Sequence, residues 1–295
     1  MAPPEYQWTN NVTVSGNVDI GDGTGFAFAG IDPTVKRGCP DDLCGFTGQI
    51  LFDSNATVGG GTGFNLTLNG DYEEGSVIAR RNIASGASEA GFSVSPGGAC
   101  DGGFCPGAGT PTVQLLGNVA AGNGTGFVSI GTGPITGNTA SGNSGAGFSV
   151  NAPVQEAFHG NSAIGNGGPG VVVNYSPDQF TVLPPDSGFS SFSHNNFYGN
   201  DRNRPMLLIT PSFTPPNFNP GPGARCGVLN VGALGNLFVL PQPPPPPTVT
   251  LPAPNNFWGT TTGSSDTSGG ACDQNGGVTM SQSLAGTPFP ITSAY

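Results

Sequence analysis

Residues 117–131 read GNVAAGNGTGFVSIG, and residues 137–150 read GNTASGNSGAGFSV. The two stretches share an Asn, a Gly four residues after it, and a Gly-Phe pair followed by alternating apolar residues. Self-similarity of this kind indicates a repeat architecture. Related copies occur at 16–30 (GNVDIGDGTGFAFAG), 54–68 (SNATVGGGTGFNLTL), 81–94 (RNIASGASEAGFSV) and 160–173 (GNSAIGNGGPGVVV), with a shorter copy at 194–200 (HNNFYGN).

The repeat length predicts stacked coils of short strands. Successive copies are as little as 20 residues apart between Asn118 and Asn138, and 23 between Asn138 and Asn161. Such a unit has room for about three short strands divided by Gly- and Asn-rich turns. Stacked coils would pair these strands in parallel at about 4.8 Å and bury Val, Ile, Phe and Ala inside. Longer separations are this unit plus an inserted loop. A β-sandwich, the alternative, does not predict near-identical corners at a coil period.

The composition excludes several classes of protein. The chain of 295 residues holds 51 Gly and 29 Pro but only 25 charged residues, the sum of 7 basic and 18 acidic ones. Gly and Pro are the poorest helix formers, which argues against a helical bundle and most α/β enzymes. Collagen is excluded because the Gly residues keep no three-residue period. The net charge of −11 and the lack of a basic stripe argue against nucleic acid as a partner. No apolar run of about 18 residues occurs, so we expect no membrane insertion.

Two residue types of the repeat have predicted structural roles. Asn tolerates the left-handed backbone of a sharp corner, and its amide can bond to the same amide in the next coil. The Phe that follows Gly is expected to stack inside the coils. The predicted corner ladder is Asn17, Asn55, Asn82, Asn118, Asn138, Asn161 and Asn195. The predicted aromatic stack is Phe26, Phe64, Phe92, Phe127 and Phe148.

The Asn-x-Ala-x-Gly-Asn…Gly-Phe-x-Val units resemble the right-handed parallel β-helix repeats of the pectin-lyase-like superfamily. Asn255-Asn256-Phe257-Trp258-Gly259-Thr260 resembles a segment common in the last coils of bacterial surface proteins of this kind. The resemblance implies an all-β, right-handed parallel β-helix (solenoid) of about eight coils in a single domain, 1–295. Regular coils are expected at 10–205, a Pro-rich loop region at 206–254, and a final coil and C-terminal cap at 255–295.

Six cysteines point to an oxidising compartment. Cys39 and Cys44, and likewise Cys100 and Cys105, are separated by four residues, so each pair can close a small disulfide loop. Cys226 and Cys272 would then bond across the Pro-rich region. The alternative is a four-thiolate zinc site built from the two closely spaced pairs. We favour disulfides, and therefore an exported protein. The first residues lack the basic and apolar regions of a signal peptide, so we expect these 295 residues to lack the export signal.

The sequence contains few candidates for catalytic residues. Hydrolytic members of the superfamily use clustered carboxylates, but here 118–173 contains one acid, Glu156. Lyase members use an Arg or Lys base near calcium, and Arg202 and Arg204 are the weak candidates here. His194 and His159, one coil apart at nearly the same register, could transfer protons. The simpler interpretation is that all four are structural. Gly21 to Gly25 contains one Asp, too few ligands for calcium, so we expect a turn there and no metal site.

The sequence therefore predicts a secreted or cell-surface, non-catalytic β-solenoid with a structural or adhesive role. The alternatives are a calcium-dependent polysaccharide lyase-like enzyme and a glycan-binding module that does not cleave its ligand. We expect no cofactor, unless the lyase alternative brings calcium. The expected partners are another copy of the chain or a surface glycan.

Overall fold

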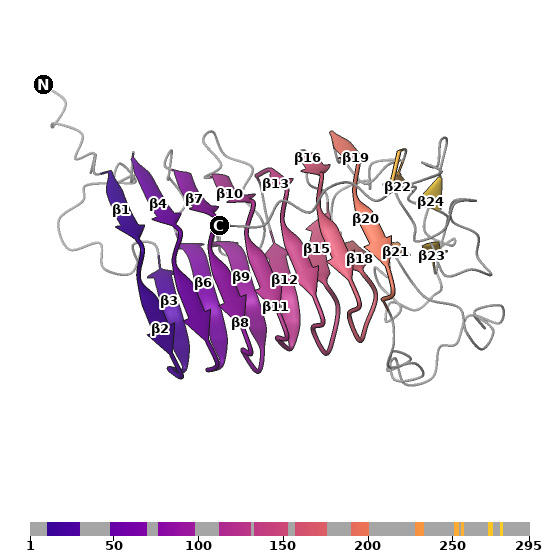
Figure 1. Cartoon of the computed structure of the whole chain (residues 1–295). Helices are drawn as coiled ribbons and strands as arrows, with labels where there is room; N and C mark the ends of the chain where they lie inside the picture. Colours follow the sequence, from indigo (N-terminus) through magenta and orange to yellow (C-terminus); the bar gives the residue numbers. More distant parts are fainter. Residues whose placement is uncertain are drawn as a thin grey trace, which may run out of the picture.

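A computed structural model describes residues 11–29, 48–69, 76–97, 112–130, 133–152, 157–175, 190–200, 228–232, 251–253, 255–256, 271–273 and 278–279. This part of the chain contains strands and turns but no helix. Its strands form three long sheets in which every pair is parallel, and they lie side by side along a rod (Figure 1). The prediction of an all-β parallel β-helix is confirmed. Within the described ranges there is, accordingly, no helix that could span a bilayer.

Each coil contributes one strand to each of the three sheets, in chain order. The first sheet contains β1 (Val12–Ser15), β4 (Gln49–Asp53), β7 (Ser76–Arg80), β10 (Thr112–Leu116), β13 (Ile135–Thr136), β16 (Ala157–His159) and β19 (Ser191–Ser193). The second sheet contains β2 (Val18–Ile20), β5 (Ala56–Val58), β8 (Ile83–Ser85), β11 (Val119–Ala121), β14 (Thr139–Ser141), β17 (Ser162–Ile164) and β20 (Asn196–Tyr198). The third sheet contains β3 (Thr24–Ala29), β6 (Thr62–Asn69), β9 (Ala90–Gly97), β12 (Thr125–Ile130), β15 (Phe148–Ala152), β18 (Val171–Tyr175), β21 (Val228–Gly232) and β23 (Ala271–Asp273). β22 (Leu251–Pro252) and β24 (Val278–Thr279) form a separate pair.

The chain turns from the first sheet to the second at what we call the first corner. One residue there has a positive φ, between 55° and 68°, and the next residue is Asn in every coil. A positive φ turns the chain sharply in a single residue, which lets two short strands follow each other almost directly. The positive-φ residues of the first corner are Gly16, Ser54, Arg81, Gly117, Gly137, Gly160, His194 and Asn255.

The turn from the second sheet to the third, the second corner, starts with a glycine in all seven coils. The φ of this glycine lies between 61° and 82° in every coil, from Gly21 to Gly199. The middle residue of each second-sheet strand points inward and is small in the central coils, as at Ala84, Ala120 and Ala140, which are fully buried. Small residues let this sheet lie close to the aromatic core.

The core is an aromatic stack along the rod axis. The rings of Phe26, Phe64, Phe92, Phe127 and Phe148, one from each third-sheet strand from β3 to β15, stack with centroids 4.7–5.1 Å apart. The next third-sheet residue in register is Val171. The first sheet replaces the lost ring volume, because Phe158 and Phe192 follow Ile135 in register along that sheet. The ring centroids of Phe158 and Phe192 are 4.8 Å apart. The core keeps its volume by exchanging large and small residues between sheets.

The Gly of each Gly-Phe pair is required by close contact between coils. A Cβ placed on Gly126 would lie 2.4 Å from the carbonyl oxygen of Gly147 in the next coil and 2.9 Å from Asn143 Nδ2. Equivalent contacts occur at Gly25, Gly63, Gly91 and Gly147. Any side chain at this position would push neighbouring coils apart, because backbone atoms cannot move aside.

Candidate functional site

The predicted corner asparagines lie at the first corner, where they form a continuous hydrogen-bonded ladder. In a central rung, Asn118 donates through its backbone N (2.9 Å) and through Nδ2 (3.0 Å) to Oδ1 of Asn138. Asn118 Nδ2 also donates to the carbonyl of Ala79 (2.8 Å). Each carboxamide is therefore engaged on both sides of its coil. The rungs of this ladder are Asn17, Asn55, Asn82, Asn118, Asn138, Asn161, Asn195 and Asn256.

The last rung, Asn256, extends the ladder beyond the set expected from the repeats. Asn195 donates through Nδ2 to Asn256 Oδ1 at 2.9 Å, although 61 residues separate the two in the chain. Asn256 belongs to the Asn-Asn pair that resembles a terminal-coil segment, and Asn255 before it has a φ of 55°. The signal was present in the sequence, but the insertion between 200 and 255 hid its register.

A second ladder, which the sequence analysis missed, runs along the second corner. Asn123 donates through Nδ2 to Asn143 Oδ1 (3.1 Å), and Asn143 to Asn166 Oδ1 (2.8 Å). Asn166 in turn donates to Asn200 Oδ1 (2.8 Å). Each of these residues follows the first-ladder Asn of its coil by five positions, a spacing visible in the sequence. The asparagines of both ladders form hydrogen bonds along the rod. All of them except Asn17 are buried. The amides of these buried asparagines therefore stabilise the fold and are not available to bind a ligand.

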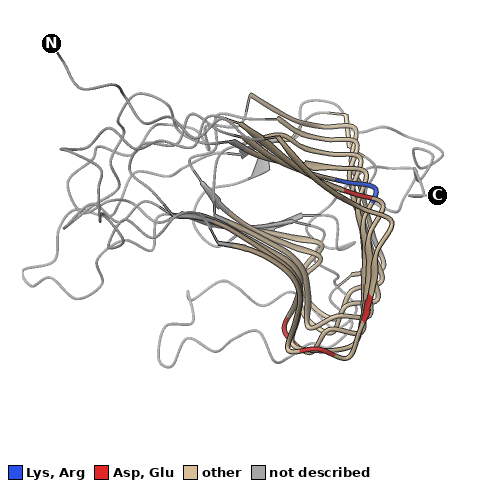
Figure 2. Ribbon diagram, turned by 90° about the vertical axis from the view of Figure 1, so that its left-hand side faces the viewer, with Lys and Arg blue, Asp and Glu red and all other residues tan. Residues whose placement is uncertain are grey.

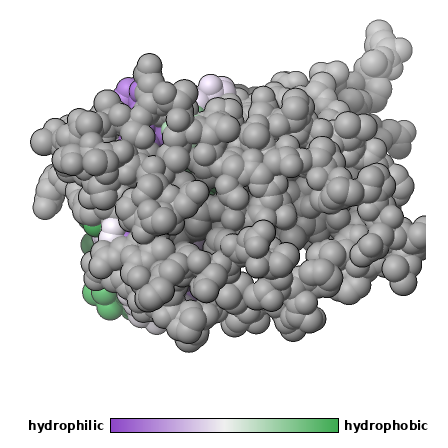
Figure 3. Space-filling view, turned by 90° about the vertical axis from the view of Figure 1, so that its right-hand side faces the viewer, coloured by the Kyte–Doolittle hydropathy of each residue, from purple (hydrophilic) through white to green (hydrophobic). Residues whose placement is uncertain are grey.

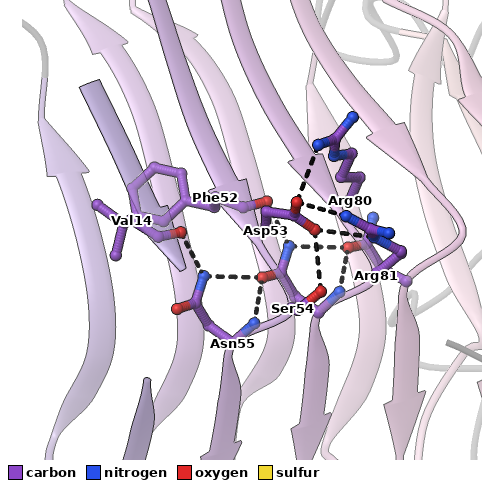
Figure 4. Close-up of polar contacts among 9 residues, drawn as sticks. Val14, Phe52, Asp53, Ser54, Asn55, Arg80 and Arg81 are labelled. Atoms are coloured by element: carbon purple, nitrogen blue, oxygen red, sulfur yellow. Dashed lines mark hydrogen bonds and ion pairs between the residues drawn. The ribbon is translucent and has the colours of Figure 1, made fainter. Parts of the chain in front are cut away.

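Two polar clusters lie on the first corner, and the first contains Asp53, Arg80 and Arg81. Asp53 Oδ2 accepts a bond from Arg80 Nη2 at 2.9 Å, and Asp53 Oδ1 accepts one from Arg81 Nε at 2.9 Å. Arg81 Nη2 also donates to Oδ2, and the Ser54 hydroxyl contacts Oδ1 at 3.0 Å (Figure 4). These bonds, led by the bond from Arg81, hold the pKa of Asp53 well below its ordinary value, against the opposing effect of burial.

Arg81 occupies a strained position for its side chain. Its φ is 56°, and the corresponding residues in four other coils are Gly16, Gly117, Gly137 and Gly160. A left-handed conformation costs an L-residue with a Cβ roughly 1–2 kcal/mol more than it costs glycine. The two bonds from the Arg81 guanidinium to the largely buried Asp53 carboxylate oppose this cost. Ser54, His194 and Asn255 adopt the same conformation in other coils, so this corner accommodates residues other than glycine.

The second cluster contains His159, Ser193 and His194. His159 ends β16 and pairs in register with Ser193 of the next coil, while His194 occupies the first corner with a φ of 60°. The ring centroids are 4.9 Å apart, and the Ser193 hydroxyl lies 3.3 Å from His159 Nδ1 and 3.1 Å from His194 Nδ1. Burial, and then the charge on His194, lower the pKa of His159. The two imidazoles that the sequence placed at similar register are thus brought together, offset by one residue.

Two acids, Asp19 and Asp22, lie at the N-terminal end of the described rod. Asp19 is the inward-facing residue of β2, in register with Thr57. Desolvation raises the pKa of Asp19, and a hydrogen bond with Asp22 and the negative charge of Asp22 raise it further. The Thr57 hydroxyl is buried without a hydrogen-bond partner. Among the residues whose placement is described, no three His, Cys, Asp or Glu side chains come together as metal ligands would.

Several residues with a predicted functional or structural role lie outside the part of the chain that the structure describes. They include the weak lyase candidates Arg202 and Arg204 and five of the cysteines, Cys39, Cys44, Cys100, Cys105 and Cys226. Cys272 lies in β23, where only the backbone is described. The disulfide pairing and the lyase base therefore stay predictions.

Comparison with known proteins identifies no relative. No protein-family model matches the chain. No curated protein and no solved structure was found to be similar to it.

Proposed function

We propose that this protein is a non-catalytic β-helix of the pectin-lyase-like kind that serves as a rigid structural or adhesive rod at or outside the cell surface. The observation that carries the proposal is a strip of apolar side chains on the outer face of the second sheet. Ile20 is 74% exposed and Val18 67%, and Val58 and Ile83 are also exposed. They come from three successive strands, β2, β5 and β8.

The strip lies on a surface suited to contact. Val18 is in register with Ala56, which is in register with Ile83, and Ile20 is in register with Val58. The side chains therefore form two short parallel rows on a sheet surface, which can contact another surface over their whole length. Hydrophobic residues reach the surface on one flank of the rod (Figure 3). Contiguous exposed apolar residues on a monomer mark interaction surfaces.

The interior supports a mechanical role. Two asparagine ladders and a ring stack connect successive coils in addition to the strand pairing. The coils that contain Asn118 and Asn138 are joined by all three sets of contacts. A rod of this kind keeps its outer rows in a fixed arrangement, which adhesion through a repeated surface requires. The assignment to the pectin-lyase-like kind rests on the resemblance of the repeat units and of the segment 255–260.

The adhesion proposal is tested with the double variant Val18→Thr, Ile20→Thr, which keeps β-branched residues on β2 but removes apolar surface. Sedimentation velocity and retention on glycan-coated and alkyl-coated sensors should show that wild-type protein associates or adheres and that the variant does so at least several-fold less. Ser85→Thr on the same face is the matched control and should behave as wild type. Equal behaviour of the wild type and the double variant would contradict the proposal.

The enzyme alternative is tested by incubating the protein with pectate, polygalacturonate, alginate and xylan, with and without calcium. Unsaturated or reducing ends that form with calcium and disappear in Arg202→Ala or Arg204→Ala would place the chain among the lyases and overturn the non-catalytic proposal. No product from any polysaccharide would support it.

A further inference from the structure

We propose that Arg80 and Arg81 form a binding site for a single oxyanion group, a carboxylate, sulfate or phosphate, on the exposed side of the first corner. The site is separate from the apolar strip on the second sheet, so it stands or falls independently of the adhesive role. Seen along the rod, the one blue segment of the described chain lies at a corner of the cross-section beside a red one (Figure 2).

The charge at this corner is unbalanced within the described residues. Two guanidinium groups, one on Arg80 and one on Arg81, share the single carboxylate of Asp53. The other acids with described side chains lie elsewhere. Asp19 is on β2, Asp22 follows it at the second corner, and Glu89 accepts a bond from Thr62 at the start of β6. Among the described side chains, the corner therefore carries one net positive charge, to which an anion would be attracted.

The geometry leaves guanidinium donors facing outward. Asp53 engages Arg81 through Nε and Nη2 and Arg80 through one Nη2. In the described part of the chain, Nε and Nη1 of Arg80 and Nη1 of Arg81 make no hydrogen bond. Both side chains are about half exposed, 44% and 50%, whereas Asp53 is only 13% exposed. Asp53 thus holds the two planar groups in place from below, and their remaining donors can bind an oxyanion.

The next coil leaves room for the molecule that carries the oxyanion. The backbone N of Arg81 donates to the carbonyl of Leu116, so Gly117 is the neighbouring corner residue along the rod. Within the described part of the chain, a Cβ on Gly117 would meet no atom within 4 Å, so no described residue covers the surface beside Arg81.

The charge of the whole chain narrows the ligand class. With a net charge of −11, the protein repels polyanions at long range. We therefore infer a ligand with a single oxyanion group and no other charged group. A uronic acid and a sulfated sugar both satisfy this chemistry, and a free phosphate is the third source.

The test is a titration of the full chain, followed by calorimetry or NMR at low ionic strength. The probes are galacturonate, N-acetylglucosamine 6-sulfate, inorganic phosphate and neutral galactose. Wild-type protein should bind at least one of the three anions saturably and should not bind galactose. Added salt should weaken binding, since the exposed charges are screened. The anion that binds best identifies the source of the oxyanion.

Arg81→Gly is the decisive variant because it removes the guanidinium and restores the corner residue that other coils use. It should fold and weaken binding about tenfold or more, the loss of a charge-assisted bond. Asn255→Gly makes the same backbone change at the first corner of another coil, away from Asp53 and without removing a charge, and it should bind as wild type. Equal affinity in wild type and Arg81→Gly, or no saturable binding of any anion to wild type, would overturn the proposal.

Discussion

His159 and His194 lie in adjacent coils with ring centroids 4.9 Å apart, and the hydroxyl of Ser193 contacts Nδ1 of both rings. Only one of the two imidazoles can be protonated without placing two positive charges side by side. Because the pairing of coils holds the rings together, protonation of His159 is linked to the stability of the fold.

Stability is expected to fall as the pH drops below the ordinary histidine value of 6.5. The pKa of His159 is lowered in the folded protein, so the unfolded chain binds the proton first as the pH falls. Proton binding therefore stabilises the unfolded state relative to the folded state, and the free energy of unfolding decreases. Urea midpoints between pH 8 and pH 5 measure the effect. His159→Thr should flatten the profile, and Thr fits there because Thr136 occupies the same row. An unchanged profile in this variant would show that the pair does not control the pH dependence.

Asn138→Ala should be one of the most destabilising single substitutions in the rod. Asn138 is fully buried, accepts two bonds from Asn118 and donates through Nδ2 to Asn161 and to the carbonyl of Leu115. Removing the carboxamide leaves buried donors and acceptors without partners, which should cost about 3–5 kcal/mol of unfolding free energy. Urea denaturation measures the loss. Ser141→Ala, three residues later at the less buried end of the same short strand, should change stability by less than about 0.5 kcal/mol. A cost below about 1 kcal/mol for Asn138→Ala would mean that the ladder contributes little.

Asp53→Asn should reduce stability at neutral pH and make the protein less sensitive to acid. The bonds from Arg81 and Arg80 hold the pKa of Asp53 below its ordinary 3.8. The ion pair therefore stabilises the fold above that value and is lost as the pH falls through the lower, folded value. Thermal unfolding from pH 7 to pH 2 should show a smaller decrease for Asp53→Asn than for wild type. Ser141→Ala removes no charged group and should leave the acid decrease as in wild type. Identical acid profiles for wild type and Asp53→Asn would exclude this ion pair as a source of acid sensitivity.

Gly126→Ala should destabilise the rod far more than Gly117→Ala. The added methyl group at Gly126 would meet the Gly147 carbonyl at 2.4 Å, whereas at Gly117 it meets no atom within 4 Å. Gly117→Ala should cost only the left-handed strain, about 1–2 kcal/mol. Gly126→Ala forces two coils apart and should cost at least about 3 kcal/mol, or prevent folding. Chemical denaturation of the two variants side by side makes the comparison. The reverse order would show that corner conformation, and not close contact between coils, restricts these glycines.

Much of the fold could be predicted because the residues that define each coil lie close together in the sequence. A coil of about 20 residues carries its own corner and its own apolar residues, so the copies at Asn118 and Asn138 are sufficient to indicate parallel stacking. The second ladder at Asn123 and Asn143 was equally readable, since it repeats at the same interval, but its absence from the first three coils obscured it. Asp22, Gly60 and Ala87 occupy its place there.

The candidate site was harder to predict because neighbours across coils are separated by insertions of unequal length. Asp53 and Arg81 are 28 residues apart in the chain, and Asn195 and Asn256 are 61 apart, yet each pair is in hydrogen-bond contact. No local pattern marks which acid meets which base. The sequence singled out Arg202 and Arg204, which lie outside the described residues, and passed over Arg80 and Arg81, which the coils bring together around Asp53.

The sequence by itself determined the coil, its three strands and the corners at which it turns, because left-handed corners, small inward residues and Gly-Phe contacts depend on residue types at short spacing. Only the tertiary structure decided which side chains of different coils meet, how Phe158 takes over the stack after Phe148, and where the exposed charges gather. The physical reason is that an inserted loop of any length leaves the stacking of the coils unchanged. Contacts between coils therefore depend on the register of the strands and not on distance along the chain.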